Sequence, residues 1–235
     1  MIHDIHSHTY YSFCGRDDPH LTVDAAIAAG IECFGICDHN YGITRDGNPG
    51  QIDEYLEFLD RIKDEYKDRI KLVRGIEICT LDRHRLLDGA DISHFDYCLI
   101  ENLDSDESII RPDERGESGI FEYAKFLGCP KVGIAHTNLF AFINRLGADP
   151  YEFCSRLAQS GVFWEMNMNY DSIHSYREHR YVKDFAASEY QQDIIRRSGL
   201  QIAVGFDGHK VEDYRPDRVI GMCRLLEEKD IPTAF

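Results

Sequence analysis

Short apolar segments alternate with helical patterns along almost the whole chain, and this alternation constrains the fold more than any other feature. Helices are predicted between the segments, for example over 52–62 and 183–198, where apolar residues recur at helical spacing. Strands that alternate with helices are typical of parallel βαβ units. The predicted strands cover residues 2–6, 33–37, 70–76, 95–100, 132–135, 162–164 and 202–206.

Seven such units favour a closed or nearly closed α/β barrel, because their strands are almost continuously apolar. A doubly wound open sheet is the alternative fold. It would normally carry a glycine-rich turn after its first strand, and the sequence has none there. The chain has 235 residues, and we expect one domain over residues 1–235.

Every predicted strand ends in a side chain that can bind a metal ion. These side chains are His6 and His8, Asp38 and His39, Glu77, Glu101, His136, Glu165, and Asp207 with His209. In an α/β barrel the carboxyl ends of all strands meet on one face. Charged groups gathered there are unfavourable unless they are paired or bound to a metal. The pattern therefore predicts a metal site with nitrogen and oxygen ligands, suited to Zn, Mn or Fe.

The first predicted strand carries the densest part of this pattern. Because residues two apart share one face of a strand, Asp4, His6 and His8 are expected to point the same way. Two histidines held in this way can bind one metal ion. A nearby carboxylate can orient an imidazole ring by accepting its second N–H, and we expect Asp4 to have this role.

The candidate ligands exceed the four to six that one ion takes, so we expect two or three divalent ions. Sites with several metals suit the hydrolysis of phosphate esters. One ion lowers the pKa of a bridging water to give a hydroxide, while the others hold the phosphoryl oxygens and the leaving group.

The composition limits the kinds of partner that we expect the chain to bind. The formal net charge is −16, which repels phosphate backbones, so we expect no nucleic-acid partner. No apolar run could span a bilayer, and the N-terminus lacks the features of a signal peptide. The eight cysteines are scattered and form no C-x-x-C pair, which indicates a reducing, cytoplasmic location. The oligomeric state is left open.

Taken in order, the strand-end motifs resemble those of the PHP (polymerase and histidinol phosphatase) family. The matching stretches are 6–9, 37–40, 75–77, 134–137, 165–167 and 205–209, which together span nearly the whole chain. The resemblance implies a distorted (β/α)7 TIM-like barrel and a trinuclear metal centre that hydrolyses phosphate esters. Small stand-alone members look like phosphatases of the histidinol-phosphate type. By motif match the ligands would be His6, His8, His39, Glu77, His136, Asp207 and His209.

The sequence departs from the family pattern at two places. Many members carry a His or Asp ligand shortly after H-x-H, where this chain has Cys14. We expect Asp17 to substitute, with Asp18 or His20 as alternatives. Many members also have a His at the end of the fourth strand, and we expect Glu101 to replace it. If neither substitution holds, the centre would be dinuclear.

The first interpretation is therefore a metal-dependent phosphoesterase acting on a small phosphorylated metabolite. Asp207 and His209 are expected to serve the reaction at the metals, and Arg16 is the candidate for a phosphate clamp. The run 169–180 is a candidate wall of the substrate pocket.

Two other classes remain open. Amidohydrolase-like C–N hydrolases also carry H-x-H after the first barrel strand, but no lysine ends a middle strand here to form a bridging carbamate. The chain could also be a non-catalytic module that a metal stabilises.

Overall fold

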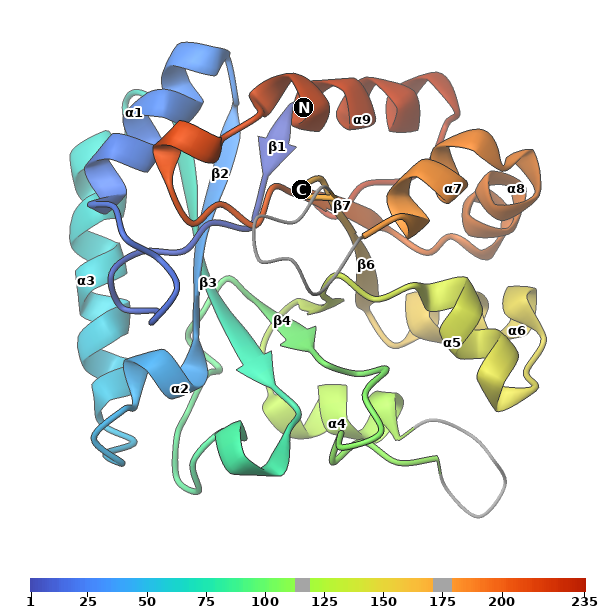
Figure 1. The fold of residues 1–235 in the computed structure, drawn as a ribbon, viewed down its shortest axis with the longest axis horizontal. Helices are drawn as coiled ribbons and strands as arrows, with labels where there is room; N and C mark the ends of the chain where they lie inside the picture. Colours follow the sequence, from blue (N-terminus) through green and yellow to red (C-terminus); the bar gives the residue numbers. More distant parts are fainter. Residues whose placement is uncertain (113–118, 171–178) are drawn as a thin grey trace.

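The computed structural model describes residues 1–112, 119–170 and 179–235. Within these ranges seven strands form one sheet in the order β1-β2-β3-β4-β5-β6-β7, and all neighbouring pairs are parallel. The strands are His3–Asp4 (β1), Cys33–His39 (β2), Lys71–Cys79 (β3), Tyr97–Glu101 (β4), Val132–Ile134 (β5), Val162–Asn167 (β6) and Ile202–Gly205 (β7). Strands that are neighbours in the chain are thus also neighbours in the sheet (Figure 1).

The two ends of the sheet meet, so the strands form a nearly closed barrel. The Ile5 N–H donates to the Val204 carbonyl oxygen at 2.9 Å, and the His8 N–H donates to the Gly208 carbonyl oxygen at 2.8 Å. The strand order never reverses, as it would in a doubly wound sheet. The predicted (β/α)7 TIM-like barrel is confirmed, and the open-sheet alternative is wrong.

Helices surround the strands on the outside of the barrel (Figure 1). The α-helices are Pro19–Ala29 (α1), Asn40–Ile43 (α2), Gln51–Tyr66 (α3), Ile120–Leu127 (α4), Leu139–Leu146 (α5), Pro150–Gln159 (α6), Tyr181–Ala187 (α7), Glu189–Ser198 (α8) and Pro216–Glu228 (α9). The described part of the chain also has 3-10 turns at Asp82–His84 (η1) and Val211–Asp213 (η2). Within the described ranges, none of the helices has both the length and the apolar character that crossing a membrane requires.

The strands bury both faces, which explains their apolar sequences. In β2, Phe34 and Ile36 belong to the large apolar cluster under the helices, whereas Cys33 and Cys37 belong to a smaller cluster inside the barrel. Tyr97 fills much of the interior, and a Cβ placed on Gly75 would overlap its ring. The interior of the barrel around Tyr97 is thus packed with apolar groups. The polar side chains gather instead at the carboxyl ends of the strands.

Two local predictions are wrong. The first regular strand covers only His3–Asp4 rather than 2–6, because its hydrogen-bond partners change where it meets β7. The single helix expected over 183–198 is two helices, α7 and α8. Ser188 is extended (φ −104°, ψ 99°), and its side chain accepts a hydrogen bond from the Gln191 N–H at 3.3 Å, so it ends one helix and begins the next.

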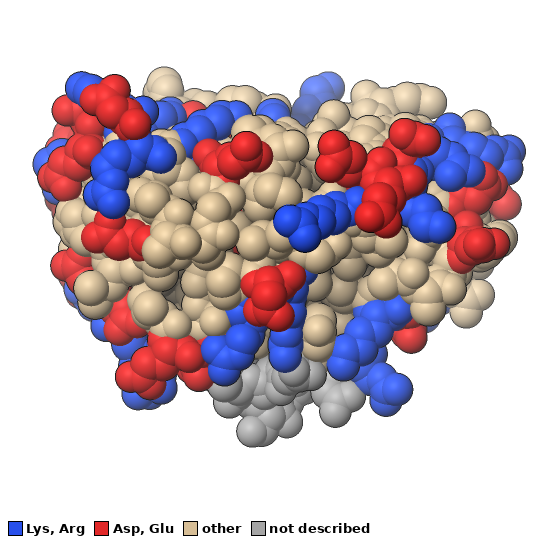
Figure 2. All heavy atoms as spheres, turned by 90° about the horizontal axis from the view of Figure 1, so that it is seen from above, with Lys and Arg blue, Asp and Glu red and all other residues tan. Residues whose placement is uncertain are grey.

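Charged side chains of both signs lie next to one another over the face drawn in Figure 2. The chain has 42 acidic and 26 Lys or Arg residues, so its surface is acidic on balance.

Candidate metal centre

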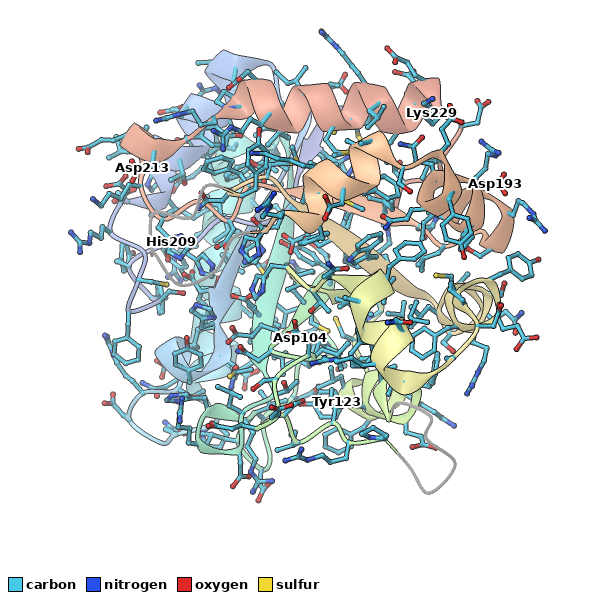
Figure 3. All side chains as sticks on the ribbon, turned by 45° about the vertical axis from the view of Figure 1, so that its right-hand side comes forward. Asp104, Tyr123, Asp193, His209, Asp213 and Lys229 are labelled. Atoms are coloured by element: carbon cyan, nitrogen blue, oxygen red, sulfur yellow. The ribbon has the colours of Figure 1, made fainter. Side chains whose placement is uncertain are left out.

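Metal-capable side chains from most of the strands meet at the carboxyl end of the barrel. His209, labelled in Figure 3, lies on the segment that follows β7. The groups whose ligand atoms all lie within 4.8 Å of one another are His8–Cys14–His39, His6–His8–Glu77, His8–Asp207–His209 and His39–Glu77–Glu101. They share members, so they form one continuous cluster rather than separate sites.

Glu77, from β3, lies at the centre of this cluster and is fully buried. Its Oε2 atom is 2.7 Å from His39 Nδ1, 3.4 Å from His6 Nε2 and 3.5 Å from His8 Nε2. Its Oε1 atom is 2.9 Å from His136 Nε2. Burial would raise the pKa of Glu77, but the surrounding imidazoles lower it well below its usual range. The carboxylate is therefore charged.

Several imidazoles have raised pKa values, because carboxylates surround them. Burial alone would lower the pKa of His6, but Glu165, Glu77 and Asp207 raise it well above its usual value. The pKa values of His39, His136 and His209 are raised by buried carboxylates in the same way.

Three buried polar atoms in the cluster, His39 Nδ1, Glu77 Oε2 and Glu101 Oε1, lie close to one another but form no well-aligned hydrogen bond with any described residue. Buried polar atoms are rarely left in this state, since an unpaired one is energetically unfavourable. All three point at the same place, because Glu101 Oε1 lies 3.4 Å from His39 Nδ1. One cation would satisfy all of them.

The spacing of the ligand atoms also fits a metal. Two ligands of a tetrahedral zinc ion, each at about 2.1 Å from it, lie roughly 3.4 Å apart. His6 Nε2 and His8 Nε2 are 3.1 Å apart, and His8 Nε2 is 3.1 Å from Asp207 Oδ1. His209 Nδ1 donates to the Asp207 carbonyl oxygen at 2.9 Å, which leaves Nε2 of this ring for an ion. The residues present therefore fit ions with mixed nitrogen and oxygen ligands.

Backbone strain marks two of these residues. His136 (φ 23°) and Asp207 (φ 59°) adopt positive φ values, each at the second residue after the end of its strand, β5 or β7. Side chains other than glycine are disfavoured in this region, and such strain gathers at functional sites. The turn directs both side chains into the cluster.

Neighbouring residues fix the imidazole rings. Glu165, from β6, is fully buried; its Oε1 is 2.7 Å from His6 Nδ1, and its Oε2 accepts the His136 N–H at 2.8 Å. Ser12 Oγ lies 3.1 Å from His8 Nδ1 and donates to Asp38 Oδ1 at 2.7 Å. Because Nδ1 of each ring is engaged in this way, His6 and His8 present Nε2 to the centre. A contact at the second ring nitrogen commonly orients metal-binding histidines like this.

Asp4 has a different role from the one predicted. Its carboxylate accepts hydrogen bonds from the backbone N–H groups of Phe206 (2.9 Å) and His6 (3.3 Å) and from the Tyr214 hydroxyl (2.8 Å). It joins β1 to the segment after β7, and its hydrogen-bond partners among the described residues include no imidazole. The expected common direction holds for His6 and His8, whose Nε2 atoms are 3.1 Å apart, but not for Asp4, where the regular strand ends.

The structure does not bring Asp17 to the cluster. Its Oδ2 accepts the Val211 N–H at 2.7 Å, at the start of η2. The two alternatives are engaged elsewhere. Asp18 caps α1 by accepting the His20 N–H, and the His20 ring bonds Asp18 (2.6 Å) and Glu65 (2.8 Å) at the surface. Cys14, for which a substitute ligand was expected, itself lies with His8 and His39 in the cluster.

Burial alone would raise the pKa of the Cys14 thiol, but hydrogen bonds with His209 and His39 lower it to about 5. Glu101 lies in the cluster, beside His39 and Glu77, and its role as a ligand stays a prediction. Arg16 is exposed, and its N–H donates to the His209 carbonyl oxygen at 3.1 Å. Its guanidinium forms no ion pair with the part of the chain that the structure describes. Most of the predicted pocket wall, 171–178, lies outside the described residues.

The sequence matches the PHP domain family over residues 4–211, which is most of the chain. The chain belongs to the PHP domain family. No curated protein matches the sequence. The resemblance drawn from the strand-end motifs is thereby confirmed.

Solved structures with the same fold include three phosphatases. Histidinol phosphate phosphatase from Lactococcus lactis, complexed with zinc, L-histidinol and phosphate, is 16% identical with a TM-score of 0.63; the alignment covers 98% of this chain and 94% of that one. A putative histidinol phosphatase from Listeria monocytogenes is 12% identical (TM-score 0.53; 90% and 96% covered).

The third structure comes from work on YwqE of Bacillus subtilis and CpsB of Streptococcus pneumoniae, described as metal-dependent tyrosine phosphatases. It is 17% identical with a TM-score of 0.50, and 96% of this chain and 86% of that chain are covered. At these identities the likeness establishes the shared barrel.

Proposed function

We propose that this PHP-family chain is a metal-dependent phosphoesterase that hydrolyses a small phosphorylated metabolite, as a phosphomonoesterase of the histidinol-phosphatase type. The observation that carries the proposal is the set of buried atoms on His39, Glu77 and Glu101 that form no hydrogen bond with the described residues, within a cluster of imidazoles and carboxylates. The fold is shared with phosphatases, one of which was solved with zinc and phosphate, and this supports the same chemistry.

We assign two or three divalent ions, Zn, Mn or Fe, to this cluster. Their ligands are drawn from His6, His8, His39, Glu77, Glu101, His136, Asp207 and His209. Bound ions would supply Lewis acidity toward the phosphoryl oxygens and make water a nucleophile near neutral pH. The chain contributes orientation: Glu165 and Ser12 fix two rings, and Glu77 faces four imidazoles at once.

Arg16 is our candidate for the phosphate clamp. Its backbone is tied to the cluster through the His209 carbonyl oxygen, while its side chain is exposed at the rim. A guanidinium presents paired N–H donors that match two phosphate oxygens. Asp207 and His209, on the adjoining segment, would face the same substrate group.

We further propose that the substrate is small and is not a nucleic acid, since the net charge of −16 opposes binding of a phosphate backbone. The eight free cysteines fit a reducing cytoplasm. We treat residues 1–235 as one domain.

The test is phosphate release from a panel of phosphomonoesters and diesters by the purified chain, stripped with a chelator and then supplied with Zn, Mn or Fe. Amide substrates are assayed in parallel. We expect phosphate release only with metal, and a near-complete loss in His8→Ala. His94→Ala is the matched control, because His94 is on the surface, 72% exposed.

Turnover of amides but not of phosphate esters would replace the proposal with a C–N hydrolase. Full phosphatase activity in a folded His8→Ala protein would refute the assigned centre. A lower melting temperature without metal, and no turnover of any substrate, would favour a metal-stabilised module.

A further inference from the structure

The loop that carries Cys14 is anchored on both sides. Before it, Ser12 is held by Asp38, which accepts hydrogen bonds from the Ser12 N–H (3.2 Å) and hydroxyl (2.7 Å). After it, Gly15 packs so closely on the Thr9 backbone that no Cβ would fit. The next residue donates its N–H to the His209 carbonyl oxygen at 3.1 Å. Hydrogen bonds and close packing on both sides of Cys14 thus fix the position of its side chain.

This loop delivers the sulfur to the metal centre. Cys14 Sγ and ligand atoms of His8 and His39 all lie within 4.8 Å of one another. His39 also belongs to the group with Glu77 and Glu101, and each of these three contributes a buried atom without a hydrogen-bond partner in the described structure. The unpartnered atoms point to a cation here independently of the cysteine.

Cys14 also differs from the other cysteines of the chain. The other seven are buried, whereas Cys14 is only partly buried. Cys33 and Cys37, for example, pack with apolar groups inside the barrel, and they act as small hydrophobic side chains. Packing therefore accounts for those two but does not account for a cysteine among imidazoles.

We propose that the Cys14 thiolate is a ligand of the metal centre, and that this sulfur biases the centre toward zinc and ferrous iron over manganese. On binding, the S–H bond breaks, its proton passes to solvent, and the sulfur lone pair forms the bond to the ion. Thiolate is a soft ligand that favours Zn and Fe, whereas carboxylate suits Mn. The inference rests on the proposed function only in requiring that the cluster bind metal.

X-ray absorption of the zinc-loaded chain tests it without any turnover. Zinc–sulfur bonds are about 2.3 Å long, against about 2.0–2.1 Å for zinc–nitrogen. We expect a sulfur shell in the wild type and in the control Cys154→Ala, whose cysteine lies in the outer core on α6. We expect no sulfur shell in Cys14→Asp, which keeps an ionisable ligand and still binds zinc.

Zinc bound through nitrogen and oxygen alone in the wild type would overturn the ligand assignment and leave the metal centre standing. Failure to bind any metal would overturn both this inference and the proposed function. Metal preference gives a second measure. We expect the ratio of zinc to manganese affinity to fall about tenfold or more in Cys14→Asp, and an unchanged ratio would contradict the bias.

Discussion

Replacing Glu165 by glutamine tests how much the centre depends on residues that hold its ligands. The substitution keeps the shape of the side chain but removes its charge. In the native chain one carboxylate oxygen lies 2.7 Å from His6 Nδ1, and the other accepts the His136 N–H at 2.8 Å. Glutamine has only one acceptor oxygen, so one of the two contacts would face an NH2 group instead. Either the His6 ring or the backbone at His136 loses its partner.

The expected size of the effect follows from this loss. Residues that orient metal ligands typically change metal affinity or activity by about 10–100-fold when they are replaced. In free energy this range is about 1.4–2.7 kcal/mol. Because Glu165 is fully buried and serves two residues of the cluster, we expect Glu165→Gln to fall in the upper half of the range.

The assay is a competition titration of zinc between the stripped protein and a chromophoric chelator, followed by kcat/KM for phosphate release. Glu57→Gln is the control, since Glu57 is exposed on α3 and the same charge is removed there. We expect the control to match the wild type. Equal zinc affinity and equal kcat/KM in a folded Glu165→Gln protein would refute the role assigned to Glu165.

Three further results are expected. Glu77→Gln should lower the metal content per chain, measured by elemental analysis, and reduce kcat/KM at least ~100-fold, because one carboxylate serves several ligand groups. An unchanged metal content would contradict the position of Glu77 at the centre of the cluster. Metal affinity should rise with pH, being weaker at about pH 6 than at about pH 8, because the buried imidazoles have raised pKa values and each must lose a proton before binding; a pH-independent affinity would count against those shifts. Gly75→Ala should reduce stability by about 1–3 kcal/mol in urea unfolding, because its Cβ overlaps Tyr97, whereas Gly221→Ala on α9, where a Cβ meets nothing, should add up to about 1 kcal/mol; equal effects would contradict the packing inside the barrel.

The barrel could be predicted because its strands are buried on both faces and therefore apolar almost throughout. All seven strands were located, and the polar residues at their ends marked the face where they meet. Helix α5, Leu139–Leu146, was not predicted, although its Asn138 cap and terminal Gly147 are visible in the sequence.

Contacts between distant segments were beyond the reach of the sequence. That Glu165 rather than Asp4 orients His6 depends on the closure of the barrel, which places β1 and β6 on either side of β7. His6 and Glu165 are 159 residues apart in the chain. The choice between Cys14 and Asp17 depends on where the loop after β1 turns. Its turn is set by Asp38 and the Thr9 backbone, and it leaves Asp17 facing η2. The spacing of these residues along the chain does not indicate either arrangement.

The central claim is that this centre binds metal and that the metal drives phosphate-ester hydrolysis. The most direct measurement is a titration of the stripped chain with zinc or manganese, in which bound metal per chain and the rate of phosphate release are followed together. The account predicts no activity without metal and a maximum rate only when two or three ions are bound per chain. Full phosphate release from the stripped chain in the presence of excess chelator would contradict it.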